Sequence, residues 1–208
     1  MNFLDLLGTF AFAITGAYKA KGGKLNIFGV ILLGIITAVG GGTFRDVIIN
    51  RSPLFYLKDQ NYLLVAIIGS VITYFAPTFF KKRYTLFRLI DSIGLATFVI
   101  IGTSVAYNHL FSLNSPPLLI SFLSSVFLGM ITGFGGGIIR DSIMGDMPLS
   151  LRHGSNYATA SFLGATSFYL LMFVDLKLAI IVSIVTTLTL REVVSRYGIY
   201  NKLIKKRK

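Results

Sequence analysis

Residues 132–148 read TGFGGGIIRDSIMGDMP, where three consecutive glycines in an apolar stretch are followed closely by an arginine and an aspartate. Residues 37–53 read TAVGGGTFRDVIINRSP, which repeats the same order of glycines, charged pair and final proline. The two stretches lie 95 residues apart. Two matched units of this kind indicate an internal repeat, and a repeat governs the architecture of the whole chain.

The composition is typical of a membrane protein. Of the 208 residues, 54% are apolar and 13% are charged, whereas soluble domains have about 45–50% and about 25%. A membrane-spanning helix needs about 20 mostly apolar residues. Seven stretches meet or approach this length: Phe3–Tyr18, Ile27–Ile49, Tyr62–Phe80, Leu89–Tyr107, Pro117–Met144, Asn156–Val174 and Leu178–Val194. We therefore predict an all-α membrane protein with seven transmembrane helices, forming a single domain over residues 1–208.

The repeat extends over three predicted helices. With a shift of 95 residues, Asn61-Tyr62 falls on Asn156-Tyr157, and with a shift of 86, Asp5 falls on Asp91. Because three is an odd number of spans, the second copy enters the membrane from the side opposite to the first. We therefore predict two inverted three-helix repeats, residues 3–80 and 89–174, with a seventh helix at 178–194. In transporters built from inverted repeats, the substrate and ion sites lie at the interface between the repeats.

The net charge of +12 is distributed unevenly among the predicted loops. Basic residues gather after spans one, three and five and in a tail at residues 195–208, and the alternate loops hold few. The positive-inside rule then places the N-terminus outside the cell membrane and the C-terminus in the cytoplasm. The same residues favour anionic lipid headgroups. This distribution argues against nucleic acid as a partner.

Several kinds of site are not expected. The chain has no cysteine, and its two histidines, His109 and His153, are predicted in loops on opposite sides of the membrane. A metal site built on thiolates or imidazoles is therefore improbable. The sequence holds no nucleotide-binding motif and no carboxylate pair with an obvious base. We predict no enzymatic activity, no structural metal and no cofactor.

The glycine triplets are predicted to break the second and fifth helices. A glycine in a helix interior costs about 1 kcal/mol relative to alanine, and unwound backbone is tolerated in a membrane only where protein buries it or it lines an aqueous cavity. A hinge or pore wall is therefore favoured, and close helix packing is the alternative. The candidates are Gly40, Gly41, Gly42, Gly135, Gly136 and Gly137, with Thr37 and Thr132 as further pore-lining candidates.

Arg45 and Arg140 follow the triplets and are each followed by an aspartate, Asp46 or Asp141. Charges at membrane depth need partners, and adjacent residues on a helix do not face each other. We therefore predict a crossed arrangement in which Arg45 lies near Asp141 and Arg140 lies near Asp46. These charges would stand beside the pore or gate it. The alternative is that they lie near the membrane surface and anchor the helix ends.

Other charged residues give weaker signals. Asp5 and Asp91 occupy equivalent positions at the predicted starts of helices, where an acidic side chain complements the helix dipole. Both are also candidates for lining the pore. Arg191 and Glu192, at the end of the seventh span, are interpreted as an interfacial pair.

Together, the seven spans, the two inverted repeats and the GGGxxRD motif in spans two and five resemble the prokaryotic trimeric intracellular cation (TRIC) channels. The same repeat is known in families described as glycine transporter domains. The resemblance covers nearly the whole chain. It implies a homotrimer with one pore inside each subunit, selective for monovalent cations, chiefly K⁺, with helices kinked at the triplets. Animal members bind a phosphoinositide through a basic motif that has no clear equivalent here beyond Arg45 and Arg140.

Two functions remain nearly equal on physical grounds. Inverted repeats also suit a secondary transporter of glycine or another small zwitterion, whose carboxylate would bind half-helix N-termini and whose ammonium would bind carbonyl groups. The resemblance favours the channel. A non-conducting membrane scaffold is a third possibility, and it would leave the charged glycine motifs unexplained.

Overall fold

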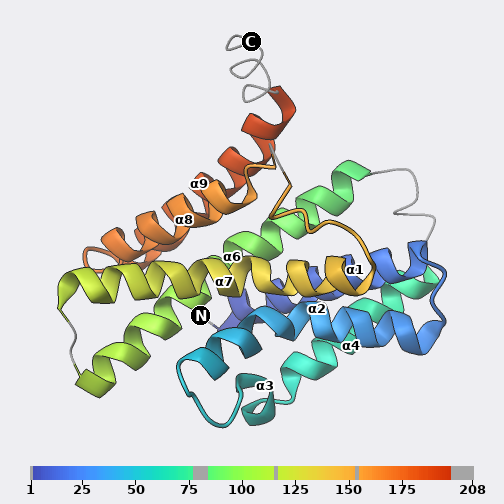
Figure 1. Ribbon diagram of the computed structural model, residues 1–208, viewed down its shortest axis with the longest axis horizontal. Coiled ribbons are helices and arrows are strands. Elements are labelled where there is room, and N and C mark those ends of the chain that lie inside the picture. Colours follow the sequence, from blue (N-terminus) through green and yellow to red (C-terminus); the bar gives the residue numbers. More distant parts are fainter. Residues whose placement is uncertain (1, 77–83, 115–116, 153–154, 198–208) are drawn as a thin grey trace.

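The computed structural model describes residues 2–76, 84–114, 117–152 and 155–197, and the regular structure within these ranges is helical (Figure 1). The helices are α1 (Asn2–Gly22), α2 (Ile27–Ile48), α3 (Phe55–Lys58), α4 (Asn61–Phe75), α6 (Tyr84–Asn114), α7 (Leu118–Ile143), α8 (Tyr157–Leu171) and α9 (Leu176–Tyr197). Short α3 was not predicted. Most of the basic tail at residues 195–208 lies outside the described residues.

The surface of this helical bundle suits a bilayer. Three helical segments are long and apolar enough to cross a membrane, namely α2, α7 and residues Thr85–Ser112 of α6, and α4 is a shorter apolar helix. Large apolar side chains are exposed on most of the helices, among them Phe28, Leu64, Ile72, Leu119, Phe127, Leu178 and Ile181. Soluble proteins rarely expose apolar surface on this scale. The prediction of an all-α membrane protein is therefore confirmed.

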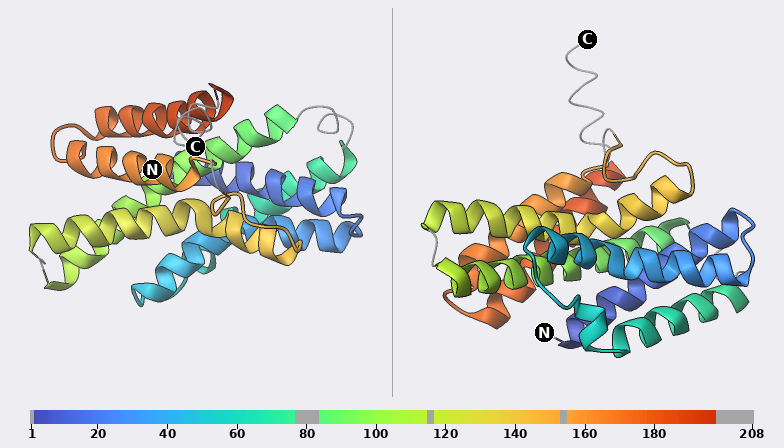
Figure 2. Two further views of the ribbon diagram at one scale, coloured as in Figure 1. Left: turned by 45° about the horizontal axis from the view of Figure 1, so that its top comes forward. Right: turned by 60° about the horizontal axis from the view of Figure 1, so that its bottom comes forward.

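The helices form two groups of three. Helices α1, α2 and α4 pack against one another, and so do α6, α7 and α8. Contacts of α1 with α6 and of α2 with α7 join the groups, and α9 packs on α8 and α6 (Figure 2). Helices α2 and α7 run side by side in opposite directions (Figure 1). Their C-terminal ends therefore point to opposite ends of the molecule.

Helices α2 and α7 end in the same way. The second residue after each helix has a left-handed backbone, with φ of 52° at Asn50 and 71° at Gly145. Asparagine and glycine are the residues that accept this conformation most readily, and it allows the next N–H to cap the helix. The capping bonds run from Arg51 N–H to the Asp46 carbonyl at 2.8 Å and from Asp146 N–H to the Asp141 carbonyl at 2.9 Å.

Small residues bring the first two helices of each group close together. A β-carbon on Gly16 or Gly102 would collide with the neighbouring helix. This close approach is typical of helix packing in membranes, where small residues let backbones come together. The contacts fall at equivalent places: Gly16 of α1 against Gly34 and Thr37 of α2, and Gly102 of α6 against Gly129 and Thr132 of α7.

Candidate functional site

Both glycine triplets lie inside unbroken α-helices. Helix α2 is continuous from Ile27 to Ile48, and α7 is continuous from Leu118 to Ile143. The predicted breaks in the second and fifth helices are therefore wrong for this structure. Intrinsic helix propensity is a weak determinant that tertiary contacts override. Here all six glycines are buried against neighbouring helices, which hold the backbone helical.

The middle glycine of each triplet lies where α2 crosses α7. A β-carbon on Gly41 would collide with the carbonyl oxygen of Thr132, and one on Gly136 would collide with the carbonyl oxygen of Thr37. A β-carbon on Gly135 would lie 3.1 Å from the Cα atom of Gly41. Only glycine permits two backbones to approach so closely, so the packing alternative is confirmed at these positions.

Gly137 is less constrained than the middle glycines, and the two threonines near the triplets are buried. Gly137 has room for a β-carbon, whose nearest neighbour would be the Tyr157 hydroxyl at 3.6 Å. Thr37 and Thr132 are fully buried, and their hydroxyls donate to carbonyls one turn earlier in their own helices, at 2.6 and 2.7 Å. In this structure the helix crossing is therefore closely packed.

Each arginine of the motif pairs with the aspartate beside it. Arg45 Nη2 lies 2.7 Å from Asp46 Oδ1, and Arg140 Nε lies 2.8 Å from Asp141 Oδ1. The predicted crossed arrangement is therefore wrong. The rule that adjacent side chains point apart describes how they leave the helix. An arginine side chain is long enough to fold back and meet its neighbour.

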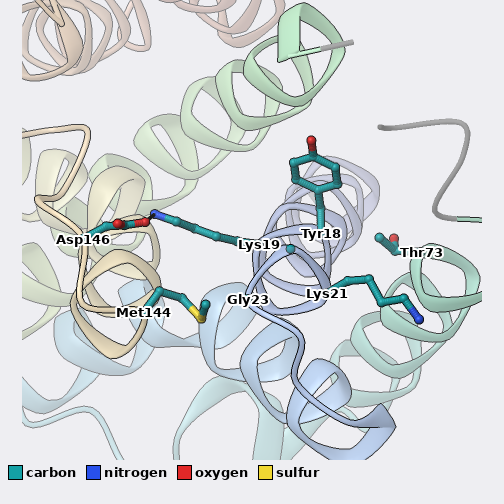
Figure 3. A pocket seen from close by; sticks show the side chains of 8 residues that line it. Tyr18, Lys19, Lys21, Gly23, Thr73, Met144 and Asp146 are labelled. Carbon is teal, nitrogen blue, oxygen red and sulfur yellow. Dashed lines mark ion pairs between the residues drawn. The ribbon is translucent and has the colours of Figure 1, made fainter. Parts of the chain in front are cut away.

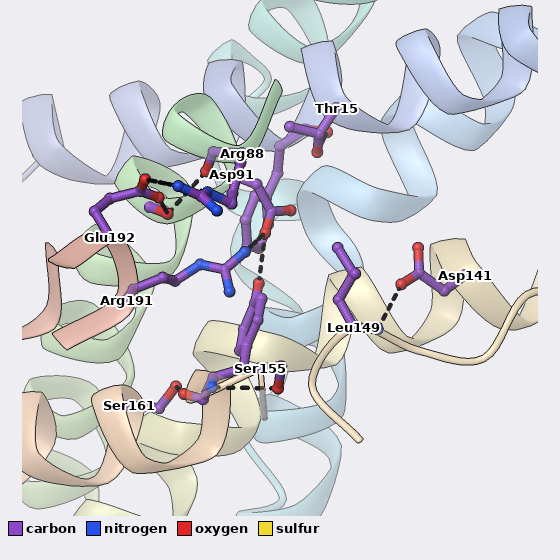
Figure 4. A network of polar contacts seen from close by, with 12 residues as sticks. Thr15, Arg88, Asp91, Asp141, Leu149, Ser155, Ser161, Arg191 and Glu192 are labelled. Atoms are coloured by element: carbon purple, nitrogen blue, oxygen red, sulfur yellow. Dashed lines mark hydrogen bonds and ion pairs between the residues drawn. The ribbon is translucent and has the colours of Figure 1, made fainter. Parts of the chain in front are cut away.

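These ion pairs lie at the C-terminal ends of α2 and α7 and are buried within the protein. Arg45 and Arg140 lie in the last turns of α2 and α7, as the anchoring alternative requires. However, they are only 3% and 0% exposed, so they do not lie at the lipid surface. The second oxygen of each aspartate accepts a backbone N–H from further along the chain. Phe55, the first residue of α3, donates to Asp46 at 3.2 Å. Leu149 donates to Asp141 at 2.9 Å (Figure 4).

Asp91 is the centre of a buried network in the second group of helices (Figure 4). It lies inside α6, which begins at Tyr84, so the predicted place at a helix start is wrong. Its Oδ1 accepts a bond from Arg140 Nη1 at 2.7 Å. Its Oδ2 accepts bonds from Arg191 at 2.6 Å and from the Tyr157 hydroxyl at 3.1 Å. Helices α6, α7, α8 and α9 therefore meet at one carboxylate.

Asp5, the repeat equivalent of Asp91, has simpler surroundings. It lies in the first turn of α1, as predicted, and accepts a hydrogen bond from the Tyr62 hydroxyl at 2.8 Å. Tyr62 and Tyr157 are themselves equivalent by the repeat. Within the described ranges, no ion pair joins Asp5 to a basic side chain.

The seventh predicted span supplies two further charges. Arg191 bonds Asp91, and its guanidinium lies 3.8 Å from the centre of the Tyr157 ring. Glu192 accepts from Arg88 at 2.8 Å and from the Ser92 hydroxyl at 2.8 Å. Both side chains thus reach into α6, so the interpretation of Arg191 and Glu192 as an interfacial pair with each other is wrong.

Lys19 is a residue of the network that sequence analysis missed. Its Nζ lies 2.6 Å from Asp141 Oδ1 and 2.9 Å from Asp146 Oδ2. Together with Lys21, Tyr18, Thr73 and Met144, Lys19 and Asp146 line a cavity of about 440 Å³ (Figure 3). The basic residues after span one are interpreted only as a topology signal in the prediction from sequence. The available signal was that Lys19 is the first basic residue of the chain and directly follows the apolar stretch Phe3–Tyr18.

A second cavity, of about 400 Å³, lies at the repeat-related place. Its lining includes Ile49 and Asn50 beyond the end of α2 and His109 of α6. The repeat relates Ile49 to Met144 and His109 to Gly23, and both of these line the first cavity. His109 lies in a helix and not in a loop as predicted, and its Nε2–H donates to the Ile49 carbonyl at 2.9 Å. His153 lies outside the described residues.

Known proteins have sequences similar to this one. The family described as Glycine transporter matches residues 2–78 and 88–173. The UPF0126 inner membrane protein YadS of Escherichia coli strain K12 is 39% identical over 196 residues, which cover 91% of this chain and 88% of YadS. A UPF0126 membrane protein of Deinococcus radiodurans is 38% identical over 173 residues, covering 82% of this chain and 76% of that protein.

Solved structures share the fold. The TRIC channel orthologue from Rhodobacter sphaeroides matches with a TM-score of 0.85 and 30% identity, covering 94% of this chain and 97% of that one. A prokaryotic TRIC channel in 0.5 M KCl matches with a TM-score of 0.83 and 30% identity, covering 95% and 96%. The helical bundle and its buried charges therefore define a membrane protein with the cation-channel fold. The chain belongs to the TRIC/UPF0126 family.

Proposed function

We propose that this protein is a channel for monovalent cations, chiefly K⁺, in the cell membrane. The observation that carries the proposal is the match to TRIC cation channels over at least 94% of the chain at 30% identity. By the same likeness, we propose a homotrimer with one pathway inside each subunit. The N-terminus would lie outside and the C-terminus in the cytoplasm, as the distribution of basic loops predicts.

The proposed pathway runs between two inverted repeats, α1, α2 and α4 against α6, α7 and α8, with α9 as the seventh span. Equivalent contacts in both groups support this arrangement. One example is the hydrogen bond from a tyrosine to an aspartate, which joins Tyr62 to Asp5 and Tyr157 to Asp91. Another is the cavity at the C-terminal end of α2, which matches the cavity at the C-terminal end of α7.

The two cavities suit the two mouths of such a pathway. They lie beside the C-terminal ends of α2 and α7, which point in opposite directions, and the glycine crossing lies between these ends. Gly41 and Gly136 touch the opposite backbone at this crossing, so α2 and α7 must separate or bend there for an ion to pass. The triplets keep their predicted role as hinges in this proposal. Thr37 and Thr132 would line the opened path.

The positive charges of Arg45 and Arg140 repel a passing cation only weakly, because both are paired with carboxylates. Arg45 is neutralised by Asp46, and Arg140 lies between Asp141 and Asp91. A charge with a close partner exerts a much weaker field at a distance than an isolated one. The carbonyl groups exposed when α2 and α7 bend would provide weak cation sites, as fast conduction requires.

Single-channel recording tests the proposal. Purified protein in a planar bilayer under asymmetric KCl should give unitary currents that reverse near the K⁺ equilibrium potential. Gly41→Leu and Gly136→Leu should abolish these currents, and Gly137→Ala, where the structure has room, should retain them. Reversal at the chloride potential would overturn the proposal.

A glycine carrier is the second candidate, because the matching family is described as Glycine transporter. A carrier would give saturable uptake of labelled glycine into proteoliposomes without unitary currents. Uptake of this kind from a protein that is electrically silent would favour the carrier over the channel.

A further inference from the structure

The two repeats differ at their equivalent aspartates. In the first repeat, Asp5 is bound by Tyr62 alone among the described residues. In the second, Asp91 is bound by Tyr157 and also by Arg140 and Arg191. The repeated sequence therefore supplies the tyrosine and the aspartate twice, but among the described residues only the aspartate of the second copy forms ion pairs with two arginines.

Helix α9 is the source of this difference, and it belongs to neither repeat. Arg191 is 3% exposed, bonds Asp91 at 2.6 Å and stacks on the Tyr157 ring. One residue further on, Glu192 bonds Arg88 and Ser92 of α6. Two adjacent side chains of α9 thus contact α6. Arg191 binds Asp91, and Glu192 binds the flanking residues Arg88 and Ser92 (Figure 4). Among the described residues, Arg140 Nε, Arg140 Nη1 and Arg191 Nη2 have partners in this network, whereas Arg140 Nη2 and Arg191 Nε have none. A buried network of this kind restrains the helices that it joins.

The arginines of the two motifs also make different contacts. Arg45 directs both Nε and Nη2 at Asp46, and no ion pair joins it to Asp5 in the described part of the chain. Arg140 directs Nε at Asp141 and Nη1 at Asp91, so it bridges α7 to α6. Arg191 holds the other oxygen of the same carboxylate, and it therefore fixes the acceptor on which Arg140 depends.

We infer that Arg191 is a positioning residue that acts through Asp91 to make the second repeat the fixed half of the molecule, and that the first repeat is the half that moves. The consequence for gating rests on the proposed channel function, but the anchor itself needs no ion flow. A carrier that exchanges the conformations of its two repeats would require equivalent halves. The anchoring of one half by α9 works against such an exchange.

Hydrogen–deuterium exchange of the full-length protein in lipid nanodiscs tests the anchor without measuring transport. Amide exchange reports how readily each segment opens. In the wild-type protein, amides of α6 and α7 should exchange about tenfold more slowly than the equivalent amides of α1 and α2. Arg191→Gln should bring the α6 and α7 rates to within about threefold of the α1 and α2 rates and leave the latter unchanged.

Lys177→Gln removes an exposed charge at the opposite end of the same helix and is the matched control, expected to leave all rates unchanged. Arg191→Lys should retain the slow exchange, because it keeps the charge beside Asp91. In an Asp91→Asn background, Arg191→Gln should add less than about twofold, because residues that act through one contact are not additive. Glu192→Gln is a milder variant and should raise exchange in α6 alone.

The inference would be overturned by equal exchange of the two repeats in the wild-type protein, by an equal rise in both repeats with Arg191→Gln, or by no rise in α6 and α7 with Arg191→Gln. Arg191→Lys behaving like Arg191→Gln, or a full additive effect in the Asp91→Asn background, would also overturn it. An electrically silent protein that shows the expected exchange pattern would overturn the proposed channel function and leave the anchor standing.

Discussion

Lys19 of the first repeat holds its ammonium 2.6 Å from the carboxylate of Asp141 in the second repeat. The same ammonium lies 2.9 Å from Asp146, at the lining of the larger cavity. Among the described residues, the ion pairs that join the two repeats are all made by Lys19. If the pathway lies between the repeats, this side chain links its two walls at one mouth.

Replacing Lys19 by glutamine should favour the open channel. The variant keeps much of the side-chain length and removes the charge that ties α1 to the end of α7. A partly exposed ion pair is worth up to about 1 kcal/mol, so the ratio of open to closed times should rise about fivefold. Single-channel recordings of the variant at fixed voltage and salt would measure this ratio.

Lys21→Gln is the matched control for Lys19, because Lys21 lines the same cavity but lies 3.5 Å from the centre of the Tyr74 ring, within the first repeat. It should change the open-to-closed ratio by less than about twofold. If Lys19→Gln left the ratio unchanged, or if both variants raised it equally, the idea of a link across the mouth would be wrong.

Alanine substitutions should lower stability at the closely packed glycines and not at Gly137, which has space for a β-carbon. A methyl group at Gly136 would meet the Thr37 carbonyl, and overpacking of this kind costs about 1–3 kcal/mol. Gly137 has ordinary space, and its replacement by alanine should stabilise the helix by up to about 1 kcal/mol. Thermal unfolding in one detergent would therefore rank Gly136→Ala below the wild type and Gly137→Ala at or above it.

A lower unfolding temperature for Gly137→Ala than for Gly136→Ala would contradict the described crossing. Gly41→Ala extends the comparison to the first repeat, where the Thr132 carbonyl makes the same contact. Both middle-glycine variants should lose a similar amount of stability.

The sequence predicted the positions of the long helices because long apolar runs specify membrane helices. The seven predicted stretches correspond to α1, α2, α4, α6, α7, α8 and α9. The repeat was readable because glycines, aspartates and tyrosines that make tight contacts recur at fixed shifts. The two tyrosines illustrate this. Tyr62 donates to Asp5 and Tyr157 donates to Asp91, and these two aspartates are related by the shift of 86.

The details of the site could not be predicted, because they depend on tertiary contacts. Nothing local distinguishes a glycine triplet that bends a helix from one that fits against the Thr132 carbonyl of a neighbouring helix. The pairing of Arg140 with Asp91 joins residues 49 positions apart. Lys19 has no basic counterpart in the second repeat, and Arg191 lies outside both repeats, so the internal comparison that revealed the motif could not reveal them.

Removing a tyrosine hydroxyl should cost more in the second repeat than in the first. Tyr157 is 1% exposed and donates to the fully buried Asp91, whereas Tyr62 donates to the partly exposed Asp5. Loss of a buried hydrogen bond to a charged group costs about 1.5–3 kcal/mol, and an ordinary one about 1 kcal/mol. Tyr157→Phe should therefore unfold at a lower temperature than Tyr62→Phe, and the reverse order would contradict the buried network around Asp91.

Neutralising the two motif arginines should have unequal effects on stability. Arg140 is fully buried and contacts Asp91, Asp141 and the Thr15 hydroxyl, so Arg140→Gln leaves two carboxylates short of a partner. Breaking a buried ion pair on one side costs about 3–5 kcal/mol. Arg45→Gln is the matched control and should cost less, because Arg45 pairs with one carboxylate, that of Asp46, whereas Arg140 pairs with two.

Thermal unfolding of both variants, together with Arg140→Gln/Asp91→Asn, would measure this difference between the motif arginines. The double variant should lose less stability than the sum of the losses in Arg140→Gln and Asp91→Asn alone, because the two residues interact directly. If the double variant were less stable than Arg140→Gln by the full cost of Asp91→Asn, the two side chains would not be coupled. If Arg45→Gln were as destabilising as Arg140→Gln, the first repeat would carry a network that the described contacts do not contain.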